Sequence, residues 1–183
     1  MFLTAALVLA ASLQAQNPAH APAPAATPDL SDPEVAHVAV TANAIDIELA
    51  QFAQTRTRTA AIRQFAQTMI NDHTAVNGQA TALAGKLGVT PADNAVSQSL
   101  LTGAAQARQG LESLQGAAFD RNYMDREIGY HQAVLDAIDK LLVPTTENAE
   151  LKNLLVAVRP AIAAHLEHAK QIRAQLSAGG TRN

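Results

Sequence analysis

The chain has 183 residues, of which 48% are hydrophobic but only 3% aromatic, and it contains no tryptophan and no cysteine. This length suits one domain with short appendages, and the absence of cysteine excludes disulfides, thiolate metal ligands and a cysteine nucleophile. The formal charge of −3 and the lack of a basic cluster argue against nucleic acid as a partner. An alanine-rich, aromatic-poor composition favours closely packed helices over a β-sandwich.

The first residues predict export. Residues 1–15 (MFLTAALVLAASLQA) form an uncharged apolar stretch that is too short to span a bilayer and ends in small residues, which is typical of a secretory signal peptide. We assign residues 1–21 to this signal peptide, with cleavage after Ala15 or Ala21, and the Pro/Ala-rich residues 22–29 to a disordered linker. The stretch lacks a Lys or Arg near its start, so a mis-assigned start or an amphipathic tail is the alternative. A periplasmic or cell-envelope location follows from export. No later segment is apolar for long enough to span a membrane.

Residues 30–176 are predicted to form a helical bundle, and residues 177–183 a disordered tail. The first helix begins at SDPE, where Ser31 and Glu34 have the spacing of a capping box. The second follows a break in TRTRT and ends at Gly88. Its apolar stripe alternates between spacings of four and three, which is the pattern of one buried helix face: Ile62, Ala66, Met69, His73, Val76, Ala80, Leu83, Leu87.

The third helix is predicted to be shorter and weaker than the others. It covers about residues 91–115, where Gly103 and Gly110 interrupt a sparse apolar pattern. Such a helix is long enough to return the chain from one end of the bundle to the other, so the long helices 59–87 and 117–142 should run parallel. We therefore predict an all-α fold, a ferritin-like four-helix bundle with a shorter crossover helix between the second and third long helices. An up-down bundle with a kinked third helix is the alternative.

Three histidines stand in the apolar stripes of three long helices. His73 lies 14 residues after position 59 and His131 lies 14 residues after position 117, so the two share a depth if their helices are parallel, and His165 falls near it. Burying imidazoles in an apolar core is unfavourable unless they satisfy one another or bind something. Neutral imidazoles with a carboxylate are a ligand set for Zn²⁺, Cu²⁺ or iron. The alternative is that each histidine only donates a hydrogen bond to a neighbour.

The predicted metal ligands lie near mid-height in the bundle: Glu48, His73, His131 and His165. Glu48 borders the inner face of the first helix, about one helical turn from the depth of His73. Three weaker candidates lie beside these residues: Glu127, His168 and Asp72. Glu127 shares a helix face with His131 at a spacing of four. Asp72 is expected to face solvent or to hydrogen-bond a metal-ligating residue rather than to bind the metal itself. No catalytic residue or organic cofactor is predicted, and the chain is expected to be a monomer or dimer.

Four segments resemble successive blocks of an exported bacterial family, domain of unknown function family 4142, whose members are often labelled outer membrane proteins. The segments are SDPEVAHVAVTANAIDIELAQFA, FAQTMINDHTAVN, FDRNYMDREIGYHQAVL and RPAIAAHLEHA. The matching elements are Glu48, Asp72 with His73, Phe119 and Asp120 with Tyr123, His131, and Pro160 with His165. The resemblance covers about residues 30–176 and implies a ferritin-like bundle in the envelope, without an established reaction.

The chain departs from true ferritins and di-iron oxidases, which use Glu-x-x-His pairs and further bridging glutamates. Here Glu127 and His131 are four apart, and His165 and His168 form a His-x-x-His pair, so carboxylates are few. Our leading prediction is a non-catalytic periplasmic bundle that binds a transition metal through core histidines. The alternatives are a non-metal structural or stress-related envelope protein and a metal-dependent oxidase, so enzymatic activity stays open.

Overall fold

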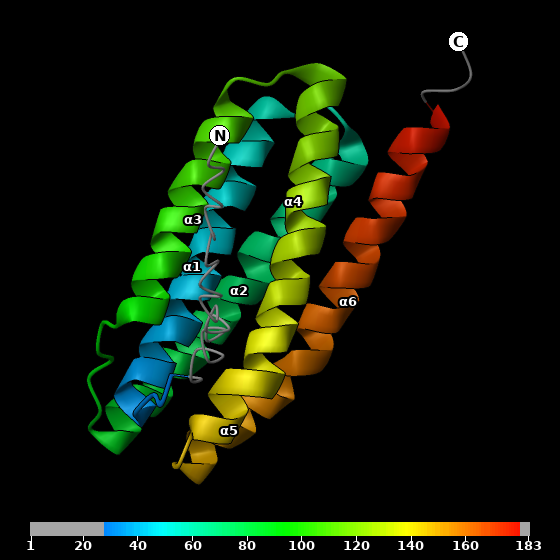
Figure 1. Cartoon of the computed structure of the whole chain (residues 1–183). Helices are drawn as coiled ribbons and strands as arrows, with labels where there is room; N and C mark the ends of the chain where they lie inside the picture. The colour runs from blue at the N-terminus through cyan, green and yellow to red at the C-terminus, as the bar shows by residue number, and fades with distance from the viewer. Residues whose placement is uncertain (1–27, 180–183) are drawn as a thin grey trace, which may run out of the picture.

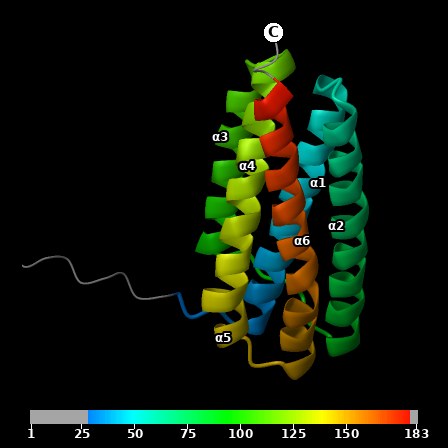
Figure 2. The same ribbon diagram turned by 90° about the vertical axis from the view of Figure 1, so that its right-hand side faces the viewer.

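A computed structural model describes residues 28–179, which form helices joined by short connections (Figures 1 and 2). The elements in chain order are α1 (Asp32–Arg56), α2 (Ala60–Leu87), α3 (Ala95–Glu112), α4 (Gly116–Ala137), the π-helical turn η1 (Ile138–Leu142), α5 (Val143–Thr145) and α6 (Ala149–Gly179). The segment from α4 through η1 to α5 is helical without a break. The predicted signal peptide and most of the predicted linker lie outside the described residues.

The long helices α1, α2, α4 and α6 form a four-helix bundle, and α3 packs against α1. Helix α1 pairs with α2, α4 pairs with α6, and α2 also contacts α6. In Figure 1, α3 carries the chain from the end of α2 back to the start of α4, so that α2 and α4 run in the same direction. The predicted all-α bundle with a crossover helix is therefore confirmed, and its connectivity is the one used by ferritin-like bundles.

The helix ends show how the sequence sets these boundaries. The Ser31 N–H donates to the Glu34 carboxylate at 2.9 Å, as the capping box predicts. Gly88 ends α2 with φ of 65°, in the left-handed region that glycine adopts without strain. Helix α3 starts at Ala95, later than predicted, because Asn94 is its N-cap: the Asn94 side-chain oxygen accepts the N–H groups of Val96 and Ser97 at 3.0 Å each.

The core consists of two apolar clusters, one toward each end of the bundle. The first joins α1, α2, α4 and α6 around Phe65, Phe119, Tyr123 and Met124. The second lies toward the opposite end and joins α1, α4, η1 and α6 around Val35, Ile138, Leu155 and other residues. The histidine-bearing positions of α2, α4 and α6 lie between these clusters, so polar side chains there are enclosed from both ends. Among residues 28–179, no helix has the length and apolar content needed to span a membrane.

Candidate metal centre

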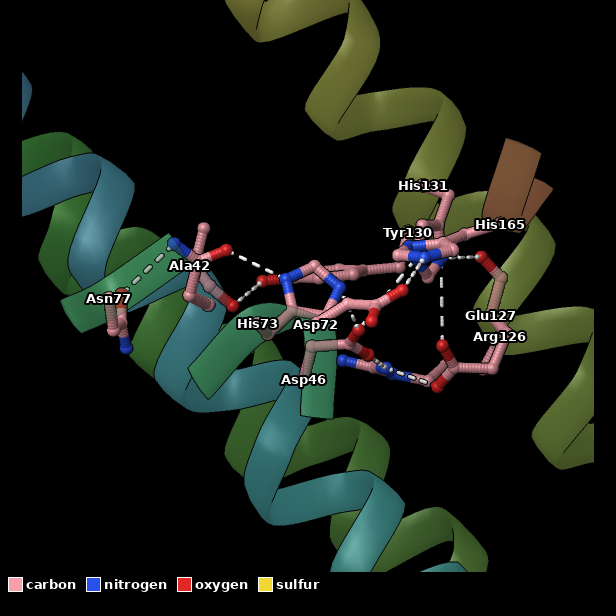
Figure 3. A network of polar contacts seen from close by, with 11 residues as sticks. Ala42, Asp46, Asp72, His73, Asn77, Arg126, Glu127, Tyr130, His131 and His165 are labelled. Atoms are coloured by element: carbon pink, nitrogen blue, oxygen red, sulfur yellow. Dashed lines mark hydrogen bonds and ion pairs between the residues drawn. The ribbon is translucent and has the colours of Figure 1, made fainter. Parts of the chain in front are cut away.

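The three histidines predicted from the helix stripes converge at the middle of the bundle (Figure 3). One ring nitrogen of each of His73, His131 and His165 lies within 4.8 Å of the other two. The ring centroids are 5.4 to 5.9 Å apart. All three side chains are buried, and they come from α2, α4 and α6. The equal depth of His73 and His131 follows from the parallel direction of their helices.

His131 and His165 each have one ring nitrogen committed to an outward hydrogen bond. His131 Nδ1 donates to the backbone carbonyl of Glu127 at 2.9 Å, and His165 Nε2 donates to the Asp72 carboxylate at 2.9 Å. Because these oxygens accept hydrogen bonds, the other nitrogens carry lone pairs. Those nitrogens, His131 Nε2 and His165 Nδ1, are buried without a hydrogen-bond partner among residues 28–179. Burial lowers the pKa of both imidazoles, which favours the neutral form.

His73 lies between an asparagine pair and a buried carboxylate. Its Nδ1 is 2.7 Å from Asn43 Oδ1, and Asn43 Nδ2 donates to Asn77 Oδ1 at 3.0 Å. With these amide orientations, His73 Nδ1 carries the proton, and Nε2 faces Asp46 Oδ2 at 2.8 Å with its lone pair. This contact brings two electron pairs together unless a proton or a cation lies between them. Turning both amides over would instead let His73 Nε2–H point toward Asp46.

Asp46 is the carboxylate that reaches the histidines, whereas sequence analysis selected Glu48. Asp46 on α1 is fully buried, with Oδ2 3.7 Å from His131 Nε2 in addition to its contact with His73. Burial opposes its ionisation, but the contact with His73 and the positive charge of Arg126 outweigh burial and hold the pKa of Asp46 well below its usual range. Asp46 is therefore the ionised carboxylate of the centre.

Glu48 is placed on the surface, and its expected position near the histidines is wrong. Its exposed carboxylate accepts a hydrogen bond from Arg108 of α3 at 3.1 Å. Positions 46 and 48 differ by about 200° around a helix, so the two side chains face nearly opposite directions. A signal for Asp46 was present in the sequence: it lies four residues after Ala42 and four before the buried Ala50, on one helical stripe.

A second acidic residue and an arginine lie beside Asp46. Glu127 is fully buried, and its Oε1 accepts from Arg126 Nη1 at 2.7 Å, while the same Nη1 is 3.6 Å from Asp46 Oδ1. Burial, together with the nearby Asp46 charge, raises the pKa of Glu127 well above its usual value. Asp46, Glu127 and His131 also bring potential ligand atoms within 4.8 Å of one another. The Arg126 guanidinium lies over the Tyr130 ring at 4.3 Å and supplies the positive charge on this side of the centre.

The other weaker candidates lie at the edge of the centre. His168 is exposed, and its ring lies edge-on to Phe65 with centroids 5.4 Å apart. Asp72 is half-exposed and orients His165 from outside, as its position beside His73 suggested. Neither residue belongs to the converging groups within the described chain.

The chemistry of the donor set fits a small transition-metal cation. Buried polar atoms in proteins are nearly always paired, yet His131 Nε2, His165 Nδ1 and Asp46 Oδ1 have no hydrogen-bond partner in the described part of the chain, and His73 Nε2 faces Asp46 Oδ2 at 2.8 Å. Three imidazole lone pairs with one carboxylate are a set suited to Zn²⁺, Cu²⁺ or iron. The outward hydrogen bond on each ring is the arrangement that fixes metal-ligating histidines.

Comparisons with known proteins agree with this fold. The profile of the family described as "Domain of unknown function (DUF4142)" matches residues 15–172, so the chain belongs to this family. No curated protein matches the chain. The chain is also similar to a solved structure described as "CopM in the Cu(II)-bound form", with 17% sequence identity and a TM-score of 0.60. The match covers 80% of this chain and 98% of that one, and at this identity it shows a shared fold.

Proposed function

We propose that this DUF4142 protein is an exported, non-catalytic helical bundle that binds one transition-metal ion. The ligands are His73, His131 and His165, with Asp46 as the carboxylate ligand in place of Glu48. The observation that carries the proposal is the pair of inward lone pairs on His131 Nε2 and His165 Nδ1. Their tautomers are set by a backbone carbonyl and a carboxylate, so in the neutral ring neither inward nitrogen can become a donor without losing its outward hydrogen bond.

The arrangement of charges supports a single ion rather than two. A dinuclear carboxylate centre needs several bridging glutamates, and the second acidic residue here, Glu127, is bound to Arg126 at 2.7 Å. A guanidinium between Asp46 and Glu127 repels a second cation at that position. This is why we place the metal-dependent oxidase behind simple binding: the groups expected around an oxygen-activating pair of irons are replaced by an ion pair.

Copper and zinc are the first ions to test. Imidazole and carboxylate sites bind first-row divalent ions in an order that peaks at Cu²⁺ and falls at Zn²⁺, with Fe²⁺ weaker. The similar structure described as Cu(II)-bound supports including Cu²⁺, because it shares the bundle. Three imidazoles and a carboxylate also suit the tetrahedral preference of Zn²⁺. Ligation requires ring nitrogens about 3–4 Å apart, and the present separations lie within 4.8 Å.

The second candidate is a structural envelope protein whose histidines only hydrogen-bond. Its support is the Asn43–Asn77 amide pair: with both amides turned over, His73 Nε2–H points toward Asp46 and needs no cation. That arrangement leaves His131 Nε2 and His165 Nδ1 unpartnered. Leaving two buried acceptors unpaired costs about 1–3 kcal/mol each, so metal binding is the better account of the whole centre.

The decisive experiment measures metal binding by the wild type, His131→Ala and His168→Ala. Calorimetric titration with Zn²⁺ and with Cu²⁺ in a competing chelator should give one ion per wild-type chain. His131→Ala should bind at least about 100-fold more weakly, because loss of a ligand exceeds the 10–100-fold effect of losing an outer partner. His168→Ala, an exposed histidine on the same helix as His165, is the matched control and should bind like the wild type. Equal affinity in His131→Ala and wild type, or no binding in either, would reject the proposal.

Turnover separates binding from oxidase chemistry. The metal-loaded wild type should consume neither oxygen nor peroxide faster than the same ion free in buffer. Catalytic turnover that His131→Ala abolishes would replace our proposal with the oxidase alternative.

The envelope location is part of the proposal and rests on residues 1–21. Intact-mass measurement of the protein from the periplasmic fraction of a Gram-negative host should show that 15 or 21 N-terminal residues are missing. An intact N-terminus recovered with the cytoplasm would contradict export.

A further inference from the structure

The apolar stripe of α2 continues beyond His73 without becoming buried. Val76, Ala80, Leu83 and Leu87 keep the helical spacing, but they are only partly covered. By contrast, the preceding stripe residues Ile62, Ala66 and Met69 are fully buried. Among described residues, the cluster at this end of the bundle includes no buried residue of α2. The half of the α2 stripe that follows His73 is therefore not buried against the other long helices, unlike the half that precedes it.

A cavity of about 300 Å³ lies along this half of α2. Its wall combines α2 with residues of α1, η1 and α6, including Ala36, Ala39, Ile138 and Leu155. Protein interiors rarely leave voids larger than a water molecule, whereas pockets for small ligands begin near this volume and are mostly apolar.

The polar groups of the cavity define what it would accept. The lining residues of the described chain include no Lys, Arg or His, and its one acidic residue, Asp32, accepts the N–H groups of Glu147 and Asn148 at 2.9 Å each. An anionic ligand would find no counter-charge. Asn43 and Asn77 line the cavity, and Asn43 contacts His73. Asn77 uses its Oδ1 to accept from Asn43, and its amide retains an N–H that no described residue accepts.

We propose that this cavity binds a neutral, largely aliphatic small molecule that carries one hydrogen-bond-accepting oxygen, such as an ester or ketone. The apolar part would fill the space beside Ala80, Leu83 and Leu87, and the oxygen would accept from the Asn77 amide. The proposal is independent of metal binding, because it rests on the cavity and its lining rather than on the imidazole lone pairs.

The test uses the full chain and the neutral fluorescent probe N-phenyl-1-naphthylamine. The wild type should bind the probe saturably, and Ala80→Phe, which places a ring in the cavity, should weaken binding at least about tenfold. Ala82→Phe is the matched control, because Ala82 lies two residues away on the exposed face of α2, outside the lining. Circular dichroism checks folding. If Ala80→Phe does not fold, Ala36→Leu narrows the same cavity from α1. Metal affinity should be unchanged in Ala80→Phe.

Competition identifies the ligand class. Methyl decanoate should displace the probe at a concentration at least about tenfold lower than decanoate, since no cation offsets the carboxylate charge. Asn77→Leu should weaken methyl decanoate binding about fivefold without changing probe binding, as expected for loss of one hydrogen bond. Absence of saturable probe binding, or equal binding by wild type and Ala80→Phe, would overturn the proposal. Dimerisation that Ala80→Phe abolishes, without probe binding, would assign the cavity to a second copy and equally overturn it.

Discussion

At the scale of single residues, the centre depends on which atom of each side chain faces inward. Asp46 and Glu48 are both acidic residues of α1, but only Asp46 lies against the imidazoles, at 2.8 Å from His73. Glu48 is bound to Arg108 on the outside. Two neighbouring carboxylates of the same helix thus offer an internal comparison, in which similar substitutions should have opposite consequences for metal binding.

Asp46→Asn should weaken metal affinity about 10–100-fold, and Glu48→Gln should leave it unchanged. The Asn side chain keeps the shape of Asp46 but removes the negative charge that attracts the cation. Glu48→Gln makes the same chemical change on the exposed face. Calorimetric titration of both variants measures the difference. Equal weakening by the two substitutions would contradict our assignment of Asp46, and a larger effect of Glu48→Gln would restore the original sequence prediction.

The sequence was sufficient to predict which histidines face the centre, but it was not sufficient to predict which carboxylate does. His73, His131 and His165 interrupt long apolar stripes, so their inward direction followed from periodicity alone. Glu48 borders a stripe on one side and Asp46 on the other, and choosing between them requires the rotation of α1 against α2 and α4. The pairing of Arg126 with Glu127 depends likewise on side-chain rotamers, which a helical repeat does not specify.

At the scale of helices, the predicted start of the crossover helix α3, near residue 91, differs from the start at Ala95 in the structure. Thr90 and Pro91 resemble a helix start, but Asn94 caps the helix, and its amide also donates to the backbone oxygens of Glu34 and Ala92 at 3.2 Å. Thr90 and Asn94 are both suitable N-cap residues by sequence, and the hydrogen bond from Asn94 to Glu34 of α1 favours Asn94 as the start of the helix. The same limit applies to α2: its stripe predicted burial through Leu87, but burial also requires partners of the right size, which only the packed bundle reveals.

Asn94→Ala should lower the free energy of unfolding by about 1 kcal/mol, within the usual range for removal of an N-cap. The lost bonds are those from Val96 and Ser97, which start α3. Urea denaturation followed by circular dichroism measures the change. Asn153→Ala, at an exposed position inside α6, is the control and should not destabilise, since alanine favours a helix. Metal affinity should stay the same in both variants, and a loss of affinity in Asn94→Ala would show that α3 contributes to the centre.

At the scale of the whole molecule, the centre connects helices from distant parts of the chain. Asp46, His73, His131 and His165 come from the four helices of the bundle, and they lie between its two apolar clusters. The crossover is what gives α2 and α4 the same direction and the histidines the same depth, so this part of the site was predictable from topology. A cation held by all four helices would oppose their separation, and its binding free energy would add to the stability of the folded chain.

Metal should therefore raise the melting temperature of the wild type, and the increase should depend on pH. At a free Zn²⁺ concentration of about 100 times Kd, the added stability is about 2.7 kcal/mol. For a chain of this size, that corresponds to an increase of about 5–11 °C.

Protons compete with the metal for the imidazole nitrogens, so this increase in melting temperature should shrink as the pH falls. Because burial lowers the pKa of His131 and His165, the loss should begin below the ordinary histidine value of about 6.5. Differential scanning calorimetry between pH 8 and 5, with and without Zn²⁺, measures both effects. His131→Ala should show little increase at any pH, and an increase as large as that of the wild type would mean that the ion stabilises the fold from some other site.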